Sequence, residues 1–295
     1  MKDGIIVKAV AGFYYVKTEE GVLRCRARGI FKKEGLTPLV GDKARITPQD
    51  AEEGVLEGIL PRRNAFVRPP IANVDAFACV ISVRDPAPNP EILDRFLLTA
   101  EMGGSEAVIL INKTDLGGSD EVCRRVTEIY GGLYTTLAVS ARAGLGIDDI
   151  KRLASGKLLA FAGPSGVGKS SLINLLVPIA DMEVGEVSGK TRRGKHTTRH
   201  VEILDNGEGL RVIDTPGYTS FDAAIPTDES PDRYYPDFAP LLGQCRFDNC
   251  RHLDEPGCAI KAAAAEGGVA PSRYENYRKL MAQAENFKQI GRIKP

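Results

Sequence analysis

The segment from Gly163 to Ser170, with the sequence GPSGVGKS, constrains the fold of this chain more than any other stretch. It fits the pattern G-x-x-x-x-G-K-[S/T], in which glycines let backbone N–H groups curl around phosphates at the start of a helix. An apolar run at 158–161 precedes it and a helical pattern begins at Lys169, so the strand–loop–helix context that the motif requires is present. We therefore expect an α/β domain that binds a nucleotide by its phosphates.

Two side chains of this loop and one downstream motif predict a magnesium site. Lys169 should reach the β- and γ-phosphates, and the hydroxyl of Ser170 should ligate Mg²⁺. The motif D-T-P-G begins at Asp214, directly after an apolar stretch at 210–213. Asp214 is expected to hold Mg²⁺ directly or through water, and the backbone N–H of Gly217 is expected to contact the γ-phosphate.

The base is indicated by the motif N-K-T-D at 112–115, which closes an apolar strand at 107–111. The carboxylate of Asp115 can accept hydrogen bonds from the ring N–H and the exocyclic amine of guanine, a pattern that adenine does not offer. A site of buried polar groups rejects the wrong base strongly, because its groups would be left unpaired. Ser140 and Ala141 follow the next apolar strand and fit the accessory loop that contacts the base. These motifs predict GTP rather than ATP.

The motifs resemble those of translation-factor-type GTPases, but they occur in a circularly permuted order. The usual order is P-loop, switch loop, D-x-x-G, N-K-x-D and S-A, whereas here N-K-T-D and S-A precede the P-loop and D-T-P-G comes last. A permutation is tolerable because the motifs sit at strand ends of one sheet and the termini can be rejoined at the surface. The segment after Gly217 then leads directly into the C-terminal part, which gives the nucleotide state a route to move that part.

A basic segment at 189–200 lies where these proteins carry the first switch loop. A threonine there can ligate Mg²⁺ and sense the γ-phosphate; Thr197 and Thr198 are both candidates, and we favour Thr198. Tyr218 stands where many GTPases carry a glutamine that positions water. Another residue must therefore orient the attacking water, and His196 is the nearest titratable candidate. The charge of the segment is either solvated or suited to rRNA phosphates.

A cluster of four potential metal ligands lies near the C-terminus: Cys245, Cys250, His252 and Cys258. Three thiolates and one imidazole complete a tetrahedral set, and a closed set indicates a structural zinc ion with no open position for catalysis. The alternative is three buried thiols beside a surface histidine. The other cysteines are scattered, and we expect buried free thiols at Cys25, Cys79 and Cys123.

The chain before the nucleotide motifs has a different pattern. Residues 1–66 contain short alternating stretches separated by glycines, as in an OB-type barrel of about five strands, although another small barrel or sandwich fits nearly as well. Further on, apolar strands alternate with helical patterns, as in a mainly parallel α/β sheet. We predict an all-β OB-type barrel at 1–68, a circularly permuted α/β P-loop GTPase domain at 69–222 and a small α-helical zinc-binding domain at 223–295.

The last predicted helix begins near Pro271 and has one apolar face, formed by residues at three-to-four spacing: Tyr274, Tyr277, Leu280, Met281, Ala284 and Phe287. Such a face packs on the rest of the protein or docks a partner. We favour packing on the zinc site or on the α/β domain.

Charge and hydropathy exclude several classes of protein. The 39 basic and 39 acidic residues give a net charge of zero, which argues against wholesale polyanion binding but allows local basic patches at 190–200 and at Arg62, Arg63 and Arg68. No apolar run approaches the roughly 18–20 residues that span a bilayer, and the N-terminus lacks the apolar core of a signal peptide. We expect a cytoplasmic monomer with no membrane partner.

Taken in order, the nucleotide motifs, G-K-H-T-T at 194–198 and C-x4-C-x-H-x5-C resemble the bacterial small ribosomal subunit biogenesis GTPase A family over essentially the whole chain. The resemblance implies binding of immature small ribosomal subunits, GTP hydrolysis stimulated by them, and help in late maturation and factor release. It also implies that the barrel and the zinc domain contact rRNA. The implied cofactors are GTP or GDP with Mg²⁺ and one structural Zn²⁺.

The site residues carried by these motifs fall into three sets besides the zinc ligands. GTP-binding positions are Asn112, Lys113, Thr114, Asp115, Ser140, Ala141, Ala162, Gly163, Pro164, Ser165, Gly166, Val167, Gly168, Lys169, Ser170, Asp214 and Gly217. The magnesium ligands are Ser170, Thr198 and Asp214. The catalytic candidates are Lys169, His196 and Thr198.

Three alternatives stay open at this point. The chain could be a GTP-dependent binding switch with negligible hydrolysis, because the missing glutamine makes slow turnover expected. It could be a P-loop kinase with an RNA-binding barrel, although N-K-T-D predicts a guanine selectivity that most such kinases lack. A purely structural zinc-and-barrel scaffold leaves the nucleotide motifs unexplained.

Overall fold

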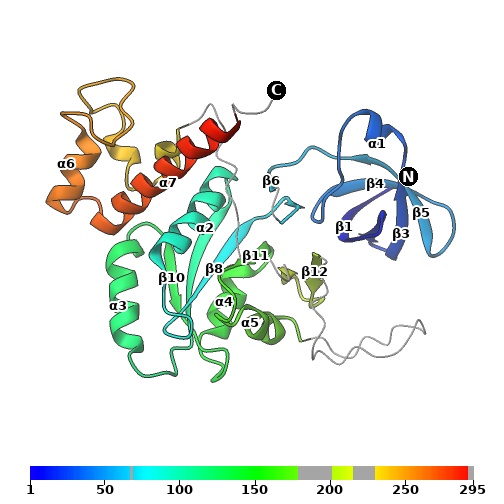
Figure 1. The fold of residues 1–295 in the computed structure, drawn as a ribbon. Helices are drawn as coiled ribbons and strands as arrows, with labels where there is room; N and C mark the ends of the chain where they lie inside the picture. The colour runs from blue at the N-terminus through cyan, green and yellow to red at the C-terminus, as the bar shows by residue number, and fades with distance from the viewer. Residues whose placement is uncertain (67–68, 179–200, 215–229, 292–295) are drawn as a thin grey trace.

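The computed structural model describes residues 1–66, 69–178, 201–214 and 230–291, with the backbone alone for Asp214 and residues 284–291. Within these ranges the chain forms a barrel, an α/β sheet and a C-terminal helical part, in that order (Figure 1). This order agrees with the predicted fold class. The boundaries at 68/69 and 222/223 stay predictions, since residues 67–68 and 215–229 lie outside the described ranges.

Five strands at the N-terminus close into a barrel of the OB type. They are β1 (Lys2–Val10), β2 (Phe13–Thr18), β3 (Gly21–Ala27), β4 (Lys43–Pro48) and β5 (Glu53–Ile59), with the short helix α1 (Ile30–Lys33) after β3. The order is β1-β2-β3-β5-β4, and β4 pairs back onto β1. Alternate residues point inward and fill the interior, among them Ile6, Val16, Leu23, Ile46 and Leu56. The alternating sequence pattern is explained by this one-sided burial.

The α/β part is built on a sheet with the strand order β10-β9-β8-β11-β13-β12. The parallel strands are β8 (Ala76–Ser82), β9 (Glu106–Asn112), β10 (Thr135–Ala138), β11 (Leu158–Ala162) and β13 (Arg211–Asp214). The edge strand β12 (Glu202–Asp205) runs antiparallel to β13. Every residue of β8 and β11 is buried, which is why both strands are continuously apolar in sequence.

Helices cover both faces of this sheet. Helices α2 (Pro90–Met102) and α3 (Ser119–Tyr130) pack on one face, and α4 (Ile147–Ala154) and α5 (Lys169–Leu176) pack on the other. The start of α2 is fixed by Asn89, whose Oδ1 accepts hydrogen bonds from the backbone N–H groups of Glu91 at 3.0 Å and Ile92 at 3.2 Å. These helices agree with the alternation of apolar strands and helical patterns in the sequence, and α5 begins at Lys169 as predicted.

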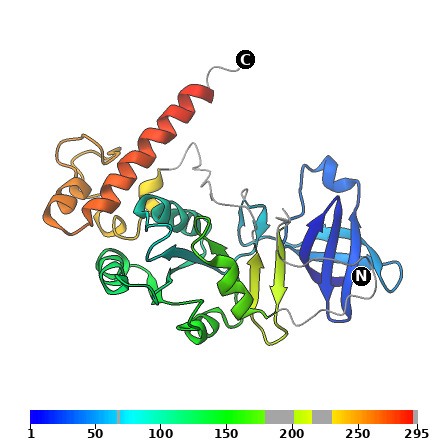
Figure 2. The same ribbon diagram turned by 60° about the horizontal axis from the view of Figure 1, so that its bottom comes forward.

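The barrel and the sheet are joined by strand pairing, by an ion pair of Lys17 with Asp205 at 2.9 Å, and by the connecting segment. Strand β1 pairs with β12 at Lys8 and Glu202, so the barrel lies against the antiparallel edge of the sheet (Figure 2). The connecting segment forms the hairpin of β6 (Ala65–Phe66) and β7 (Ile71–Ala72), and Ile71 also forms a bridge with Val40.

The two described arginines of the connecting segment, Arg62 and Arg63, are both paired with carboxylates. Arg62 holds the buried carboxylate of Asp42 with two bonds, Nε to Oδ1 at 2.7 Å and Nη2 to Oδ2 at 2.8 Å. Arg63 pairs with Asp75 at 2.7 Å. The pair of Arg62 is largely buried and that of Arg63 lies at the surface, and both hold the connecting segment in place; Arg68 lies outside the described residues.

The C-terminal part packs against α2. It contains the 3-10 turns η1 (Pro231–Tyr234) and η2 (Ala239–Leu241) and the helices α6 (Ala259–Glu266) and α7 (Pro271–Gly291). Tyr277 and Met281 of α7 are buried in one core with Leu98 of α2, so the described part of its apolar face packs inside the protein, as expected. The side chains of Ala284 and Phe287 lie outside the description. No helix in the described part of the chain combines the length and the apolar character needed to cross a membrane.

Two of the three scattered cysteines are buried thiols, as expected. Cys25 lies inside the barrel and Cys79 inside the sheet, and burial raises the pKa of the Cys25 thiol to about 11. Cys123 is only half-buried, on α3.

Gly41, between α1 and β4, provides a test of how the barrel meets the hairpin. Its φ is +96°, and a Cβ there would lie 2.0 Å from the carbonyl oxygen of Ala72. The variant Gly41→Ala should therefore lower the free energy of unfolding by more than the roughly 1–2 kcal/mol that a left-handed residue costs by itself. Gly12→Ala is the matched control, because its φ is +82° but a Cβ there meets open space. Urea unfolding measures both losses, and equal losses would contradict the packing argument.

Candidate functional site

The loop from Gly163 to Gly168 joins β11 to α5 in a conformation that only its glycines allow. Gly163 has a φ of +152°, and a Cβ there would lie 2.4 Å from the carbonyl oxygen of Val80 on β8. Gly168 caps α5 with a φ of +98°, and a Cβ there would lie 2.2 Å from Asn112 Nδ2. The loop is thus wedged between two strands, with the N-terminus of α5 directly behind it.

Lys169 folds back across this loop. Its Nζ donates hydrogen bonds to the carbonyl oxygens of Gly163 at 2.6 Å and Pro164 at 2.9 Å. The ammonium therefore lies at the loop itself, beside the helix N-terminus. Both groups favour a negatively charged ligand such as a phosphate chain.

Asn112 connects the guanine motif to the P-loop. Its side chain is 1% exposed, and Nδ2 donates to the carbonyl oxygen of Val167 at 2.7 Å. Its Oδ1 accepts a hydrogen bond from the backbone N–H of Ala141 at 3.0 Å. One buried amide thus joins three loops that lie far apart in sequence, at the carboxyl edge of the sheet. The structure brings together the three motifs as the sequence predicts.

Asp115 and Ser140 form the outer part of this site. The Ser140 hydroxyl donates to Asp115 Oδ1 at 2.6 Å and accepts a hydrogen bond from the backbone N–H of Ala143 at 3.0 Å. The hydrogen bond from Ser140 holds the pKa of Asp115 below its usual range, so the exposed carboxylate is ionised at neutral pH. An oriented, ionised carboxylate can accept two N–H groups from one edge of a base.

Two contacts brace this loop from outside. Lys113, with a φ of +66°, donates from Nζ to the carbonyl oxygen of Asp85, and Arg84 donates from Nη2 to the carbonyl oxygen of Gly117. The loop after β8 therefore supports the guanine-motif loop. Sequence reasoning missed Arg84 and Asp85, because no motif marks contacts between a side chain and the backbone carbonyl of a distant residue.

Several predicted site residues cannot be placed by side chain. The backbone of Asp214 ends β13, which runs parallel to β11, so it reaches the sheet edge that carries the P-loop. Five further candidates lie outside the described residues: His196, Thr197, Thr198, Gly217 and Tyr218.

The four predicted metal ligands converge. The ligand atoms of Cys245, Cys250, His252 and Cys258 all lie within 4.8 Å of one another. His252 Nδ1 is 3.5 Å from Cys245 Sγ and 3.5 Å from Cys258 Sγ. Zinc bond lengths of about 2.3 Å to sulfur and about 2.0–2.1 Å to nitrogen give a tetrahedral S···N edge of about 3.6 Å. The cluster can therefore hold a tetrahedral metal ion.

Asp232 orients the histidine of this cluster. Its Oδ2 is 3.1 Å from His252 Nε2, and both side chains are buried. Burial alone would raise the pKa of Asp232, but the hydrogen bond with His252 lowers it, so the carboxylate is ionised and accepts the Nε2 hydrogen. The other ring nitrogen, Nδ1, is then free to face the thiols. Asp232 lies 20 residues from His252 in sequence, so ligand spacing gave no signal for it.

Helix α6 supports two of the thiols. Cys258 caps the helix and its Sγ accepts from the backbone N–H of Lys261 at 3.4 Å. Cys245 Sγ accepts from the backbone N–H of Ala259 at 3.4 Å. Helix N-terminal N–H groups stabilise thiolates, which are the form that binds metal.

Comparison with known protein families assigns the chain. A family model described as RsgA GTPase matches residues 59–224, and one described as RsgA N-terminal domain matches residues 3–56. The chain belongs to the RsgA GTPase family. This membership confirms the GTPase assignment made from the motifs.

Relatives and solved structures agree along almost the whole chain. A protein of Caldanaerobacter subterraneus named small ribosomal subunit biogenesis GTPase RsgA is 42% identical over 96% of this chain and 96% of its own length. The crystal structure of YjeQ from Thermotoga maritima has a TM-score of 0.80 and 36% identity, and the match covers 96% of this chain and 98% of that one. The structure of YloQ, described as a circularly permuted GTPase, has a TM-score of 0.78 and 34% identity and covers 100% of this chain and 96% of that one. The permuted order read from the motifs is thus confirmed.

The base preference of this RsgA GTPase can be tested at Asp115. In Asp115→Asn, an NH2 group replaces one of the two carboxylate oxygens, so a hydrogen-bond donor faces the exocyclic amine of guanine. Loss of a charge-assisted hydrogen bond costs about 1.5–3 kcal/mol, or about 10- to 150-fold in affinity. GTP affinity should fall by that factor, and XTP should gain relative to GTP because xanthine has a carbonyl in place of the amine. Competition against a fluorescent nucleotide measures both, with Asp120→Asn on α3 as control. An unchanged GTP-to-XTP ratio would remove Asp115 from the base site.

Proposed function

We propose that the chain hydrolyses GTP on the small ribosomal subunit, which stimulates the reaction, and that it assists a late step of that subunit's maturation. The observation that carries the proposal is the buried amide of Asn112, which holds the guanine motif against the P-loop. Family membership supplies the partner, since the relatives are named small ribosomal subunit biogenesis GTPases.

In this proposal the phosphates and Mg²⁺ are held by residues of the P-loop and the D-T-P-G motif. Lys169 contacts the β- and γ-phosphates, while Ser170 and Asp214 hold Mg²⁺. Phosphoryl transfer needs little covalent help from a protein and depends on positioning and charge stabilisation. The position of the Lys169 ammonium at the loop, 2.6 Å from the carbonyl oxygen of Gly163, supports its role.

The switch residues complete the reaction in this proposal. Thr198 ligates Mg²⁺, with Thr197 as the alternative, and the N–H of Gly217 contacts the γ-phosphate. His196 orients the attacking water, because Tyr218 stands where a glutamine is usual. The missing glutamine makes slow intrinsic turnover expected, and the ribosomal partner is proposed to raise it.

The outer face of β2 and β3 supports rRNA binding by the barrel. Leu23 and Cys25 of β3 are buried, so Arg24 and Arg26 point outward. Their guanidinium carbons lie 5.0 and 4.7 Å from the ring centroid of Phe13 on β2. This face of OB barrels is the one that binds oligonucleotides, and arginine beside an aromatic ring suits stacked bases and phosphates.

The metal of the C-terminal cluster is proposed to be one structural zinc ion. Three thiols and one imidazole form a closed set that suits zinc, and the aspartate on the far side of the imidazole is typical of zinc sites. The cofactors are then GTP or GDP with Mg²⁺ and this Zn²⁺. We place the protein in the cytoplasm, where ribosomal subunits are assembled, and propose that it acts as a monomer.

Hydrolysis of GTP in the presence of ribosomal subunits tests the function. Turnover should be slow with the protein alone, rise at least 10-fold with small subunits and stay unchanged with large subunits. His196→Ala should retain GTP affinity and lose most of the stimulated turnover. Tight GTP binding without stimulation by small subunits would overturn the proposed partner, and normal stimulated turnover in His196→Ala would remove that residue from the mechanism.

A second experiment tests the metal. Elemental analysis should find one zinc ion per chain, and Cys250→Ser should lose it, while Cys123→Ser should retain it. Asp232→Asn should weaken zinc binding by about 10- to 100-fold, because the partner that orients His252 is weakened. Competition with a chromogenic chelator measures the affinity. Equal zinc affinity in Asp232→Asn and the unmodified chain would contradict the role of Asp232.

A further inference from the structure

A buried guanidinium lies between the C-terminal part and the α/β part. Arg273 of α7 is 2% exposed. Its Nη1 donates to Asp94 Oδ1 of α2 at 2.6 Å, and its Nε and Nη2 donate to the carboxylate of Asp237 at 2.8 and 2.7 Å. One side chain thus bonds a carboxylate of the nucleotide-binding part and a carboxylate of the segment that precedes the metal ligands.

Aromatic rings enclose the same guanidinium. Its central carbon lies 5.1 Å from the ring centroid of Tyr235, 5.4 Å from that of Tyr130 and 5.8 Å from that of Tyr134. Tyr130 is the last residue of α3 and Tyr134 follows it, so α3 is held as well as α2. The rings keep water out of the contact, which strengthens its electrostatic interactions.

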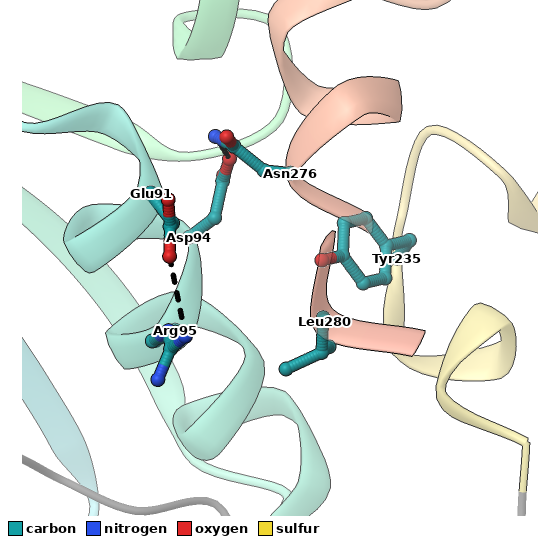
Figure 3. Close-up of a pocket in the computed structure, with 6 residues that line it drawn as sticks. All are labelled: Glu91, Asp94, Arg95, Tyr235, Asn276 and Leu280. Atoms are coloured by element: carbon teal, nitrogen blue, oxygen red, sulfur yellow. Dashed lines mark hydrogen bonds and ion pairs between the residues drawn. The ribbon is translucent and has the colours of Figure 1, made fainter. Parts of the chain in front are cut away.

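Further polar contacts bind α7 to α2. Asn276 Nδ2 donates to Asp94 Oδ2 at 2.6 Å, and Figure 3 shows both side chains between the two helices, next to Tyr235 and Leu280. Arg95 Nη2 of α2 donates to Gln283 Oε1 of α7. The carboxylate of Asp94 is therefore bonded at both oxygens by α7.

These polar contacts fix the orientation of α7 relative to α2 and to the segment that carries Asp237. Apolar packing constrains such an orientation less strictly. A planar guanidinium that bonds two carboxylates through a fork accepts only one arrangement of the three elements. The surrounding apolar core, with Leu98, Phe238 and Tyr277, stabilises the contact by apolar burial, but such packing tolerates small shifts of the helices. No residue of this cluster belongs to the nucleotide motifs or to the metal ligands.

We propose that Arg273 is a positioning residue for subunit-stimulated GTP hydrolysis: it fixes the metal-bearing part to α2 and α3, so that both reach the ribosomal subunit as one body. The inference rests on the proposed function. It opposes the expectation that the nucleotide state moves the C-terminal part, because the ion pairs with Asp94 and Asp237 would have to break in the protein interior. A rigid pair of binding surfaces also loses less freedom on binding than two tethered ones.

The test compares Arg273→Met with Arg124→Met, which removes an exposed arginine of α3 whose ion pairs with Glu121 and Glu128 are on the surface. Arg273→Met should raise the half-saturating concentration of small subunits at least 10-fold. Its intrinsic turnover, GTP affinity and zinc content should stay within twofold of the unmodified chain. Arg124→Met should change none of these values. Arg273→Lys keeps the charge but not the fork, and should restore stimulation only in part.

A second variant guards against simple misfolding. Removing one partner of a buried ion pair leaves an uncompensated charge, whereas removing the whole network is far better tolerated. The triple variant Asp94→Asn, Asp237→Asn and Arg273→Met should therefore fold and bind zinc, yet still need at least 10-fold more subunits. Folded variants with the half-saturating concentration of the unmodified chain would overturn the proposal.

Calorimetry supplies a readout that does not need the ribosome. The unmodified chain should unfold its α/β and C-terminal parts in one transition, and Arg273→Met should separate them into two. A single unchanged transition in Arg273→Met would overturn the positional role. If the unmodified chain is not stimulated by small subunits, the proposed function fails, while the calorimetric result still decides whether Arg273 joins the two parts.

Discussion

The nucleotide site depends on the side-chain amide of Asn112. This amide is buried at the end of β9, where both its oxygen and its nitrogen need partners, and it finds them in Ala141 and Val167. A buried amide that lost either partner would be destabilised, so the three loops are held in one arrangement. Gly168 has no side chain because that amide occupies the space. The P-loop geometry is thus set partly by a residue of the guanine motif.

This dependence explains why the chain order can be permuted. The contacts that build the site lie at the carboxyl edge of the sheet and join the ends of β8, β9 and β11. They do not depend on which of these strands comes first in the chain. The parallel core strands are buried on both faces, where they pack on α2, α3, α4 and α5. This packing does not depend on the order of the strands along the chain. What a permutation changes is where the ends lie, and here both ends carry an added part.

Local pattern predicted the motifs and the alternation of strands and helices, but it did not predict α1, α6 or the long-range polar contacts. The strands, the helices and the cysteine cluster follow from periodicity, capping and spacing, which are properties of neighbouring residues. Arg273 and Asp94 are 179 residues apart, and nothing near either of them indicates a partner. The same limit explains why a basic patch was predicted at Arg62 and Arg63. The sequence shows their charges, but it does not show that Asp42 and Asp75 form ion pairs with them. Asp232 was missed for this reason too.

The pairing of β1 with β12 has a consequence for how the chain can be divided. β12 is the antiparallel edge of the α/β sheet, and an uncovered edge strand offers N–H and C=O groups to any other strand. The barrel covers that edge at Glu202, and its Ala9 packs against the core of the sheet. A shortened chain without the barrel would therefore expose this edge as a template for pairing between molecules.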